Sequence, residues 1–327
     1  MSGIVDSYHR RINYTRISVT DRCNLRCIYC TAKSVPHLSH DDILRYEEIH
    51  KVVQAAARLG VNKIRLTGGE PLARLNLSRL VKLLSQVEGI DEVSLTTNGT
   101  MLDRYATELK AAGLRRVNVS LDSFRADKFK FITGSDRIAD VLRGIEVARK
   151  AGLNPVKINM VVLKDINDDE VLDFARKSIS DGWHVRFIEH MPFVNSGADN
   201  NRLVATGEIM TTIQDALGEL KPCWPKAGNG PARYYQLPDA EGTIGFIGAV
   251  TECFCAECNR FRITADGKLR PCLLDDDEID IKGPLRSGAS IEDLEQLIQE
   301  AAALKRAQHR LGEEHDPVKR QMRQIGG

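Results

Sequence analysis

The sequence lacks the features that direct a protein to a membrane, to secretion or to nucleic acid. Lys and Arg number 46 against 45 Asp and Glu, and the formal net charge of +1 gives no general attraction to nucleic acid or an anionic membrane. No apolar run is long enough to span a bilayer, and residues 1–6 hold no signal-peptide core. We therefore expect a cytoplasmic protein with no nucleic-acid or membrane partner, in which local arginines and lysines hold any anionic ligand.

Solenoid repeats and low-complexity tracts are also absent, and the first two-thirds of the chain alternates between two patterns. Strand-like runs occur at residues 15–20, 63–67, 92–97, 116–121, 156–163 and 185–188. Helix-like runs lie between them, at residues 41–59, 75–87, 103–112, 138–151 and 168–179. Repeated βα units predict an α/β fold with a parallel sheet. Because a closed barrel needs eight units, these six predict an incomplete, open parallel βα barrel.

Local signals mark the ends of these elements and a change of pattern near residue 196. Gly60, Gly113 and Gly152 stand where C-cap glycines occur, and Asp103 and Asp168 are the expected N-caps. Beyond residue 196, a loop-rich stretch precedes β-like pieces at residues 233–237, 243–247, 260–264 and 268–274 and a helix at 291–311. "TADGK" at residues 264–268 predicts a hairpin. We expect residues 1–195 to form the partial barrel and residues 196–327 a β-rich extension.

Polar residues follow the ends of the predicted strands. The first strand runs into a cysteine-rich loop, and the next three end in Thr67-Gly68-Gly69-Glu70-Pro71, Thr96-Thr97-Asn98-Gly99 and Ser120-Leu121-Asp122. The last two carry Lys157, Asn159, Arg186 and then Glu189-His190-Met191. Each such residue alone is explained as a turn former. Ligands of parallel βα proteins bind at this edge, however, so the coincidence across six strands predicts a site.

The eight cysteines are distributed unevenly. Six form two groups, Cys23-x3-Cys27-x2-Cys30 and Cys255-x2-Cys258-x13-Cys272. In a reducing cytoplasm such groups are metal ligands or free thiols rather than a disulfide framework. Zinc with His37 or His40 as fourth ligand is one interpretation, but neither histidine has a finger-like partner spacing. Two sets of three thiolates fit iron–sulfur cubes better, and each cube then keeps one iron with an open coordination position.

The first cysteine group and the motif after the second strand resemble a known superfamily. Cys23, Cys27 and Cys30, with Tyr29 before the third cysteine, resemble the radical S-adenosylmethionine (SAM) signature, and "GGEP" at residues 68–71 resembles its SAM-amino motif. The resemblance implies a [4Fe–4S] cluster on the three cysteines. It also implies that the amino and carboxylate groups of SAM chelate the open iron, and that one-electron reduction cleaves SAM to a 5′-deoxyadenosyl radical.

Motifs along essentially the whole chain narrow this resemblance. "FCAECNRFRITADGKLRPCL", "TRISVTDRCN", "LTTNGTML", "RRVNVSLDS", "KINMVVLKDIND" and the final Gly326-Gly327 are similar to the GTP 3′,8-cyclase (molybdenum cofactor biosynthesis protein A) family. The resemblance implies a second [4Fe–4S] cluster whose open iron binds the guanine of GTP. It implies that the radical abstracts the 3′ hydrogen of the ribose and that C3′ then bonds to C8 of guanine. This is the first step of molybdenum cofactor biosynthesis.

The resemblance also assigns roles to individual residues. The first cluster is implied to bind Cys23, Cys27 and Cys30, and the second Cys255, Cys258 and Cys272. SAM contacts are implied for Tyr29, Gly69, Ser120 and Met191, with Thr97, Asn98 and Asp122 beside them. GTP contacts are implied for Arg16, Lys63, Arg65, Thr96, Lys157, Arg186, Arg260, Phe261 and Arg262, of which Lys157, Arg260 and Arg262 are the catalytic candidates. A triphosphate needs such cations, and Arg260 and Arg262 point to one face of a strand.

Some residues depart from the family pattern or lie outside it. Thr31-Ala32 replace the usual Met-Pro after the third cysteine, and residues 192–199 lack the usual glycine and tryptophan after Met191. An enzyme acting on another purine nucleotide therefore stays an alternative. The tail at Gly326-Gly327 is expected to insert toward the active site. The strand-like spacing of Cys253 and Cys255 makes Cys253 an alternative ligand, but the family does not require it, so Cys253 and Cys223 are treated as bystanders.

Two other functional classes compete with this interpretation. One is a radical SAM enzyme with an auxiliary cluster that acts on a peptide, against which the Arg260 and Arg262 pair and the Gly-Gly end argue. The other is a non-catalytic zinc-binding adaptor.

The partners that we expect are GTP, an unidentified electron donor, a downstream pterin-forming enzyme and, by resemblance, a second copy of the chain. The second cluster or a nearby arginine is the candidate source of the final electron and proton.

Overall fold

A curved twelve-stranded sheet runs through the computed structural model of the chain, which describes residues 3–30, 37–191, 202–224, 230–309 and 320–326. The strand order is β12-β11-β10-β1-β2-β3-β4-β5-β6-β9-β8-β7. The first six strands are parallel and adjacent in sequence order: β1 (Tyr14–Ser18), β2 (Lys63–Thr67), β3 (Glu92–Thr97), β4 (Arg116–Ser120), β5 (Lys157–Val162) and β6 (His184–Glu189). Their carboxyl ends therefore meet along one edge.

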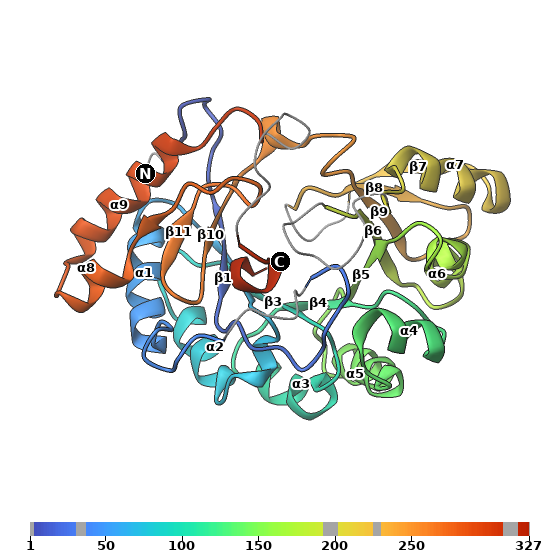
Figure 1. The fold of residues 1–327 in the computed structure, drawn as a ribbon, viewed down its shortest axis with the longest axis horizontal. Coiled ribbons are helices and arrows are strands. Elements are labelled where there is room, and N and C mark those ends of the chain that lie inside the picture. Colours follow the sequence, from blue (N-terminus) through green and yellow to red (C-terminus); the bar gives the residue numbers. More distant parts are fainter. Residues whose placement is uncertain (1–2, 31–36, 192–201, 225–229, 310–319, 327) are drawn as a thin grey trace.

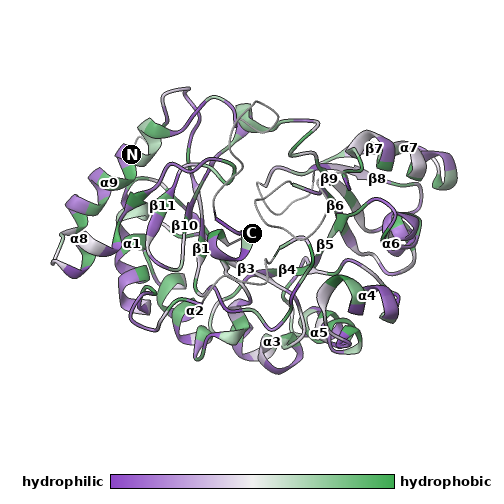
Figure 2. Cartoon of the chain, in the orientation of Figure 1, coloured by the Kyte–Doolittle hydropathy of each residue, from purple (hydrophilic) through white to green (hydrophobic). Residues whose placement is uncertain are grey.

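Helices connect these strands and cover the outer side of the sheet (Figure 1). They are α1 (Tyr46–Arg58), α2 (Leu77–Ser85), α3 (Leu102–Ala111), α4 (Ala126–Thr133), α5 (Ile138–Lys150) and α6 (Val171–Ser180), with 3₁₀ turns η1 (Pro71–Ala73) and η2 (Asp168–Glu170). In α1, Ile49, Val52 and Val53 follow the helical spacing of a single apolar face, and all three are buried. Figure 2 shows the same arrangement in the other helices outside the sheet, whose hydrophilic residues face solvent.

The C-terminal third adds strands to both edges of this sheet. It comprises α7 (Thr206–Leu217), β7 (Lys221–Cys223), β8 (Arg233–Gln236), β9 (Thr243–Ile247), η3 (Cys255–Glu257), β10 (Arg260–Ile263), β11 (Lys268–Arg270), β12 (Ile279–Asp280), α8 (Lys282–Arg286), α9 (Ile291–Leu304) and α10 (Met322–Ile325). β9 pairs in parallel with β6, and β10 pairs in parallel with β1. Since β9 and β10 are not neighbours in the sheet, the barrel stays open, which confirms the predicted fold class.

Most of the predicted elements are present, with differences at their ends. The six strands, the three C-cap glycines (φ +89° at Gly60, +106° at Gly113, +77° at Gly152) and the antiparallel β10–β11 hairpin are confirmed. The expected N-caps are wrong. α3 is capped by Met101, which leaves Asp103 in the first turn, and Asp168 begins η2 rather than capping α6. Helices α4, α7, α8 and α10 and strands β7 and β12 were not predicted.

Two predicted helices are shorter than their sequence patterns. α1 begins at Tyr46 rather than residue 41 because Arg45 is extended, and α9 ends at Leu304 rather than residue 311 because Lys305 is extended. The proposed domain boundary at residue 195 and the variant residues 31, 32 and 192–199 lie outside the described residues. Within the described part of the chain, no helix has the length and apolar character needed to cross a bilayer.

Candidate active site

A single cavity on the inner side of the sheet is lined by both cysteine groups. Cys23, Cys27 and Cys30 face it together with Cys255, Cys258 and Cys272. The first group follows β1, at the carboxyl edge of the sheet. The second comes from η3 and from the residue two beyond β11. Residues more than 200 positions apart in the sequence therefore share one chamber.

Backbone hydrogen bonds hold the first cysteine loop against the barrel. Arg26 N donates to Thr133 O (2.8 Å), and Ile28 N donates to Ile132 O (2.9 Å), which fixes the loop on α4. The Tyr29 hydroxyl donates to Asp122 Oδ2 at 2.6 Å, and Asp122 Oδ1 accepts from Val161 N at 2.9 Å. Burial raises the pKa of Asp122 to about 6, and burial and the adjacent Asp122 raise that of Tyr29.

The Gly-Gly-Glu-Pro segment packs directly under this loop. Gly69 N donates to Thr20 O and Glu70 N to Arg22 O, both at 2.7 Å, and a Cβ on Gly69 would lie 2.4 Å from Arg22 O. Only glycine permits this approach. The fully buried Glu70 carboxylate accepts hydrogen bonds from Thr97 Oγ1 (2.7 Å) and Asn98 N (2.7 Å). Glu70 therefore braces β2 and β3, which positions the polar residues at their ends.

The second cysteine group is braced by Lys305, just beyond α9. Its side chain is 3 % exposed, and Nζ donates to Pro271 O at 2.7 Å and to Arg260 O at 3.3 Å. These bonds join the strand that follows Cys258 to the residue that precedes Cys272. Burial alone would raise the pKa of Cys258, but the charges of Lys305 and Arg260 lower it overall. This half of the site is therefore electropositive.

The thiols fit a cluster better than a single ion. Among the described residues, neither group of three has all its sulfurs within 4.8 Å of one another. Thiolates around one tetrahedral ion stand about 4 Å apart, whereas those around a cube bind different irons and stand farther apart. Burial raises the pKa of Cys23 to about 12 and also raises the pKa of Cys27. Binding of iron must therefore displace protons from these thiols.

Cationic side chains occupy successive strands on the inner side of the sheet. In register, Arg262 of β10 lies beside Arg16 of β1, and Arg16 beside Arg65 of β2. The row continues through β4, β5 and β6, so that the cavity is lined by Arg16, Arg65, Arg116, Lys157, Arg186, Arg260 and Arg262. Arg116 pairs with Glu92 at 2.6 Å. The remaining cations make this wall suited to a polyanion.

Burial and the crowding of these cations shift the pKa of several groups. Burial lowers the pKa of Arg16 well below its usual range and lowers that of Arg262 to about 10. Burial also lowers the pKa of Lys157 to about 8, with a further contribution from Arg186, although Tyr234 acts in the opposite direction. Burial would raise the pKa of Tyr14, but the neighbouring guanidinium groups bring it down to about 8. Binding of an anion would relieve this repulsion.

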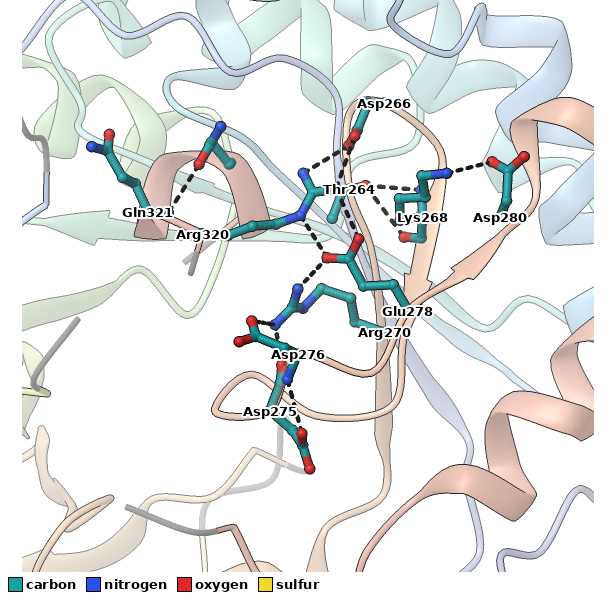
Figure 3. Close-up of polar contacts among 11 residues, drawn as sticks. Thr264, Asp266, Lys268, Arg270, Asp275, Asp276, Glu278, Asp280, Arg320 and Gln321 are labelled. Carbon is teal, nitrogen blue, oxygen red and sulfur yellow. Dashed lines mark hydrogen bonds and ion pairs between the residues drawn. The ribbon is translucent and has the colours of Figure 1, made fainter. Parts of the chain in front are cut away.

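The C-terminal segment enters the same cavity. Arg262 Nη1 donates to Gly326 O at 2.8 Å, and the neighbouring Ile325 is fully buried. Figure 3 shows how the segment is anchored: Arg320 lies between Asp266 (2.9 Å) and Glu278 (2.5 Å), and Glu278 also pairs with Arg270. The structure thus places Gly326 where the predicted tail insertion requires it, while Gly327 lies outside the described residues.

Comparisons with known proteins agree with this geometry. The "Radical SAM superfamily" matches residues 17–177, and "Molybdenum Cofactor Synthesis C" matches residues 183–311. The chain is 52 % identical to "GTP 3',8-cyclase" of Pelotomaculum thermopropionicum over 98 % of its own length and 99 % of the relative's. It is 48 % identical to "GTP 3',8-cyclase" of Moorella thermoacetica, over 98 % of this chain and 99 % of that relative. The chain belongs to the GTP 3′,8-cyclase family. The predicted resemblance is thereby confirmed.

Two solved structures share the fold of this cyclase-family chain. Streptococcus suis SuiB bound to S-adenosylmethionine superposes with a TM-score of 0.64 at 12 % identity, over 83 % of this chain and 63 % of SuiB. The protein anSMEcpe with bound AdoMet superposes with a TM-score of 0.52 at 21 % identity, over 62 % of this chain and 57 % of that one. The chain thus spans less than two thirds of either structure, and the likeness concerns the fold alone.

Most of the residues that sequence comparison assigned to SAM and GTP face the cavity of this cyclase-family chain. Those that line it are Tyr29, Gly69, Ser120, Met191, Arg16, Arg65, Thr96, Lys157, Arg186, Arg260 and Arg262. Lys63, the first residue of β2, is not among the residues that line it. Neither is Phe261. It alternates with Arg260 and Arg262, so its side chain points into the hydrophobic core and is 1 % exposed.

Several cavity residues were not predicted. Tyr14, Arg116 and Asn118 line the cavity. Tyr14 stands two positions before Arg16, while Asn118 and Arg116 stand two and four positions before Ser120 on the same strand. Strand periodicity was therefore a signal for them. Tyr234 comes from the antiparallel strand β8, and its hydroxyl lies 2.9 Å from Lys157 Nζ. The sequence holds no signal for the register of β8, so the position of Tyr234 in the cavity could not be predicted.

Replacing Gly326 by alanine is expected to lower catalytic activity at least about tenfold while iron content stays unchanged. A Cβ there would lie 2.3 Å from Thr67 Oγ1 and 3.0 Å from Ser18 Cβ, at φ +78°. The tail must therefore withdraw and release Arg262. Gly288→Ala is the matched control, because Gly288 has φ +92° but nothing within 4 Å. Equal losses in both variants, or none in Gly326→Ala, would contradict a role for the tail.

Proposed function

We propose that the chain converts GTP to a 3′,8-cyclo-dihydro-GTP, the first step of molybdenum cofactor biosynthesis, using SAM and two [4Fe–4S] clusters. The observation that carries this proposal is that two groups of three cysteines face one cavity whose wall holds a row of cations. Membership of the GTP 3′,8-cyclase family supports the same reaction. A peptide substrate would not bring the several negative charges to which this row of cations is suited.

The first half of the site is proposed to hold SAM. Cys23, Cys27 and Cys30 would bind the first cluster, which together with SAM supplies the 5′-deoxyadenosyl radical when bound. Tyr29, held by Asp122, would contact the cofactor beside the cluster. Gly69 would offer its backbone to the amino group, while Ser120 and Met191 line the remainder of this half. These residues orient the cofactor before reaction and so supply the entropic part of catalysis.

The second half is proposed to hold GTP. Cys255, Cys258 and Cys272 would bind the second cluster, next to which the guanine lies. Arg16, Arg65, Lys157 and Arg186 would bind the triphosphate, and Arg260 and Arg262 would position the ribose and base. Thr96 lies among them, and Arg65 Nη1 reaches its hydroxyl at 3.5 Å. Apolar residues such as Leu25, Val161 and Ile188 complete the lining and exclude water from the reacting carbon atoms.

Anaerobic reconstitution followed by nucleotide binding tests the proposal. Two cubes require about eight irons and eight sulfides per chain, and the loaded protein should bind GTP in preference to ATP and form the cyclised product when SAM and a reductant are added. Zinc in place of iron, or about four irons, would overturn the two-cluster proposal. Stronger binding of ATP would favour the alternative purine substrate.

Affinity for GTP is expected to fall as pH rises above 8. Burial gives Lys157 a pKa of about 8, so its ammonium group is present below that pH and lost above it. A bound triphosphate favours the ammonium form and raises this pKa, so Kd should rise by about tenfold per pH unit above 8. Isothermal titration of cluster-loaded protein without SAM measures this. Lys157→Met should bind more weakly with a flatter profile; an unchanged slope would assign the titration to another group, such as Tyr234.

Other partners are proposed from the chemistry alone. Reductive cleavage of SAM needs a one-electron donor, and the cyclised nucleotide needs a pterin-forming enzyme to consume it. We propose a cytoplasmic location, where reduced electron carriers and GTP are both available, and pairing of two copies stays a prediction. The final electron and proton are proposed to come from the second cluster and a neighbouring arginine, Arg260 or Arg262.

A further inference from the structure

Cys253, Cys255 and His309 form a compact group beside the second cysteine set. Their ligand atoms all lie within 4.8 Å of one another, the only such group of three among the described residues. Cys253 and Cys255 belong to the segment that crosses from β9 to β10, and His309 follows α9. Thiolates and an imidazole around one zinc ion stand about 4 Å apart. The group therefore has the dimensions of a site for one ion rather than for a cube.

Contacts around this group hold its two segments together. Arg10, which is 8 % exposed and paired with Asp6 at 2.6 Å, donates through Nη1 to Cys255 O (2.7 Å) and Ala307 O (3.0 Å). Its Nη2 donates to Arg306 O at 2.5 Å. One buried guanidinium group thus joins the turn that carries Cys255 to the segment that leads to His309. The relative position of the two ligands is fixed by the fold and does not depend on a bound ion.

The immediate surroundings of the ligands also suit a metal. His309 Nε2 lies 2.9 Å from Ala249 O, and a hydrogen bond to a backbone carbonyl is the usual means of orienting an imidazole ligand. Cys255 N donates to Cys253 Sγ at 3.4 Å, and the two sulfurs lie within 4.8 Å of each other. Cys253 is exposed, so an ion can reach the group from solvent. Two thiolates and one imidazole leave a fourth position for water.

We propose that Cys253, Cys255 and His309 bind a single divalent soft metal ion, of which Zn²⁺ is the best fit, when the second cluster is absent. Under the proposed function, Cys255 is also a cluster ligand. The ion and the cluster therefore exclude each other, and zinc holds the chain in a form that cannot acquire its second cluster. Cys253 then acts as the ligand that captures the competing ion, without being needed for the cluster itself.

Zinc binding is tested on the full chain carrying Cys258→Ser and Cys272→Ser, after the first cluster has been assembled so that its cysteines are occupied. Equilibrium dialysis against buffered Zn²⁺ is expected to leave one zinc per chain. Adding Cys253→Ser or His309→Gln should weaken binding at least about tenfold, while Cys223→Ser, the matched control, should not. Unchanged zinc affinity in Cys253→Ser overturns the proposal. The iron content of the first cluster shows that each variant is folded.

Competition is tested on the chain with all cluster cysteines intact. Pre-loading with one equivalent of Zn²⁺ before reconstitution should reduce iron from about eight to about four per chain, and Cys253→Ser should restore it. If the Cys253→Ser variant, reconstituted without zinc, holds about four irons fewer than the unsubstituted chain, Cys253 is a cluster ligand and the proposal is overturned. If the unsubstituted zinc-free chain takes up only about four irons, the proposed two-cluster function fails instead, while the dialysis result still decides on the zinc site.

Discussion

Cys272→Ala is expected to abolish cyclisation of GTP while SAM is still cleaved. Cys272 lines the cavity from the residue two beyond β11, next to Cys258 and Lys305. The hydrogen bond given for its sulfur within the described residues comes from Leu274 N, not from the first cysteine loop. That loop is held by α4 and by Asp122. Iron should fall from about eight to about four per chain, and 5′-deoxyadenosine should form without cyclised nucleotide. Iron analysis and chromatography of both products measure this.

Cys223→Ala is the matched control for this experiment. Cys223 is half-buried on β7, and it does not line the cavity. It should keep about eight irons and full activity. Loss of SAM cleavage in Cys272→Ala, with the first cluster present, would contradict the division of the cavity into a SAM half and a GTP half. Retention of about eight irons would show that another residue replaces Cys272.

Arg186→Met is expected to change nucleotide affinity and stability in opposite directions. Arg186 is 6 % exposed, and its Nε and Nη2 have no hydrogen-bond partner in the described part of the chain. A charge-assisted hydrogen bond contributes about 1.5–3 kcal/mol, so GTP should bind about 10- to 100-fold more weakly. Removal of a buried, unsatisfied guanidinium group should raise the free energy of unfolding of the nucleotide-free protein by about 1 kcal/mol or more.

The paired measurements are GTP titration and denaturant unfolding of the nucleotide-free protein. Arg176→Met is the control, since Arg176 is exposed and pairs with Asp173 at 3.0 Å on the outer helix α6. This substitution should leave GTP affinity unchanged and alter stability by less than about 1 kcal/mol. If Arg186→Met instead destabilised the protein and left GTP affinity unchanged, Arg186 would be a structural residue.

Local patterns were sufficient to predict the barrel strands and the residues at their ends. Arg16, Arg65, Thr96, Lys157 and Arg186 stand on short β-branched runs whose boundaries are readable, and parallel pairing places these strands side by side. Motif spacing identified the two cysteine groups. These features depend on residues that are close in the sequence, which is why they could be predicted without coordinates.

Features that depend on long-range pairing could not be predicted. Nothing in the sequence shows that β9 and β10 join opposite edges of the same sheet, or that β8 delivers Tyr234 to Lys157. Cys253 was treated as a bystander because the family pattern does not require it, and its neighbour in space, His309, lies 56 residues away in the sequence. Phe261 was assigned to GTP from its motif, although strand alternation directs its side chain to the core.

The placement of β9 and β10 has a consequence for synthesis of the protein. When the ribosome has made the first 191 residues, β1 and β6 each present a row of unpaired peptide groups, because the strands that pair with them are made 50 or more residues later. Such open strand edges promote intermolecular aggregation. The nascent half-barrel is therefore expected to need protection by a chaperone, and a chain truncated after Met191 should be recovered mainly in inclusion bodies.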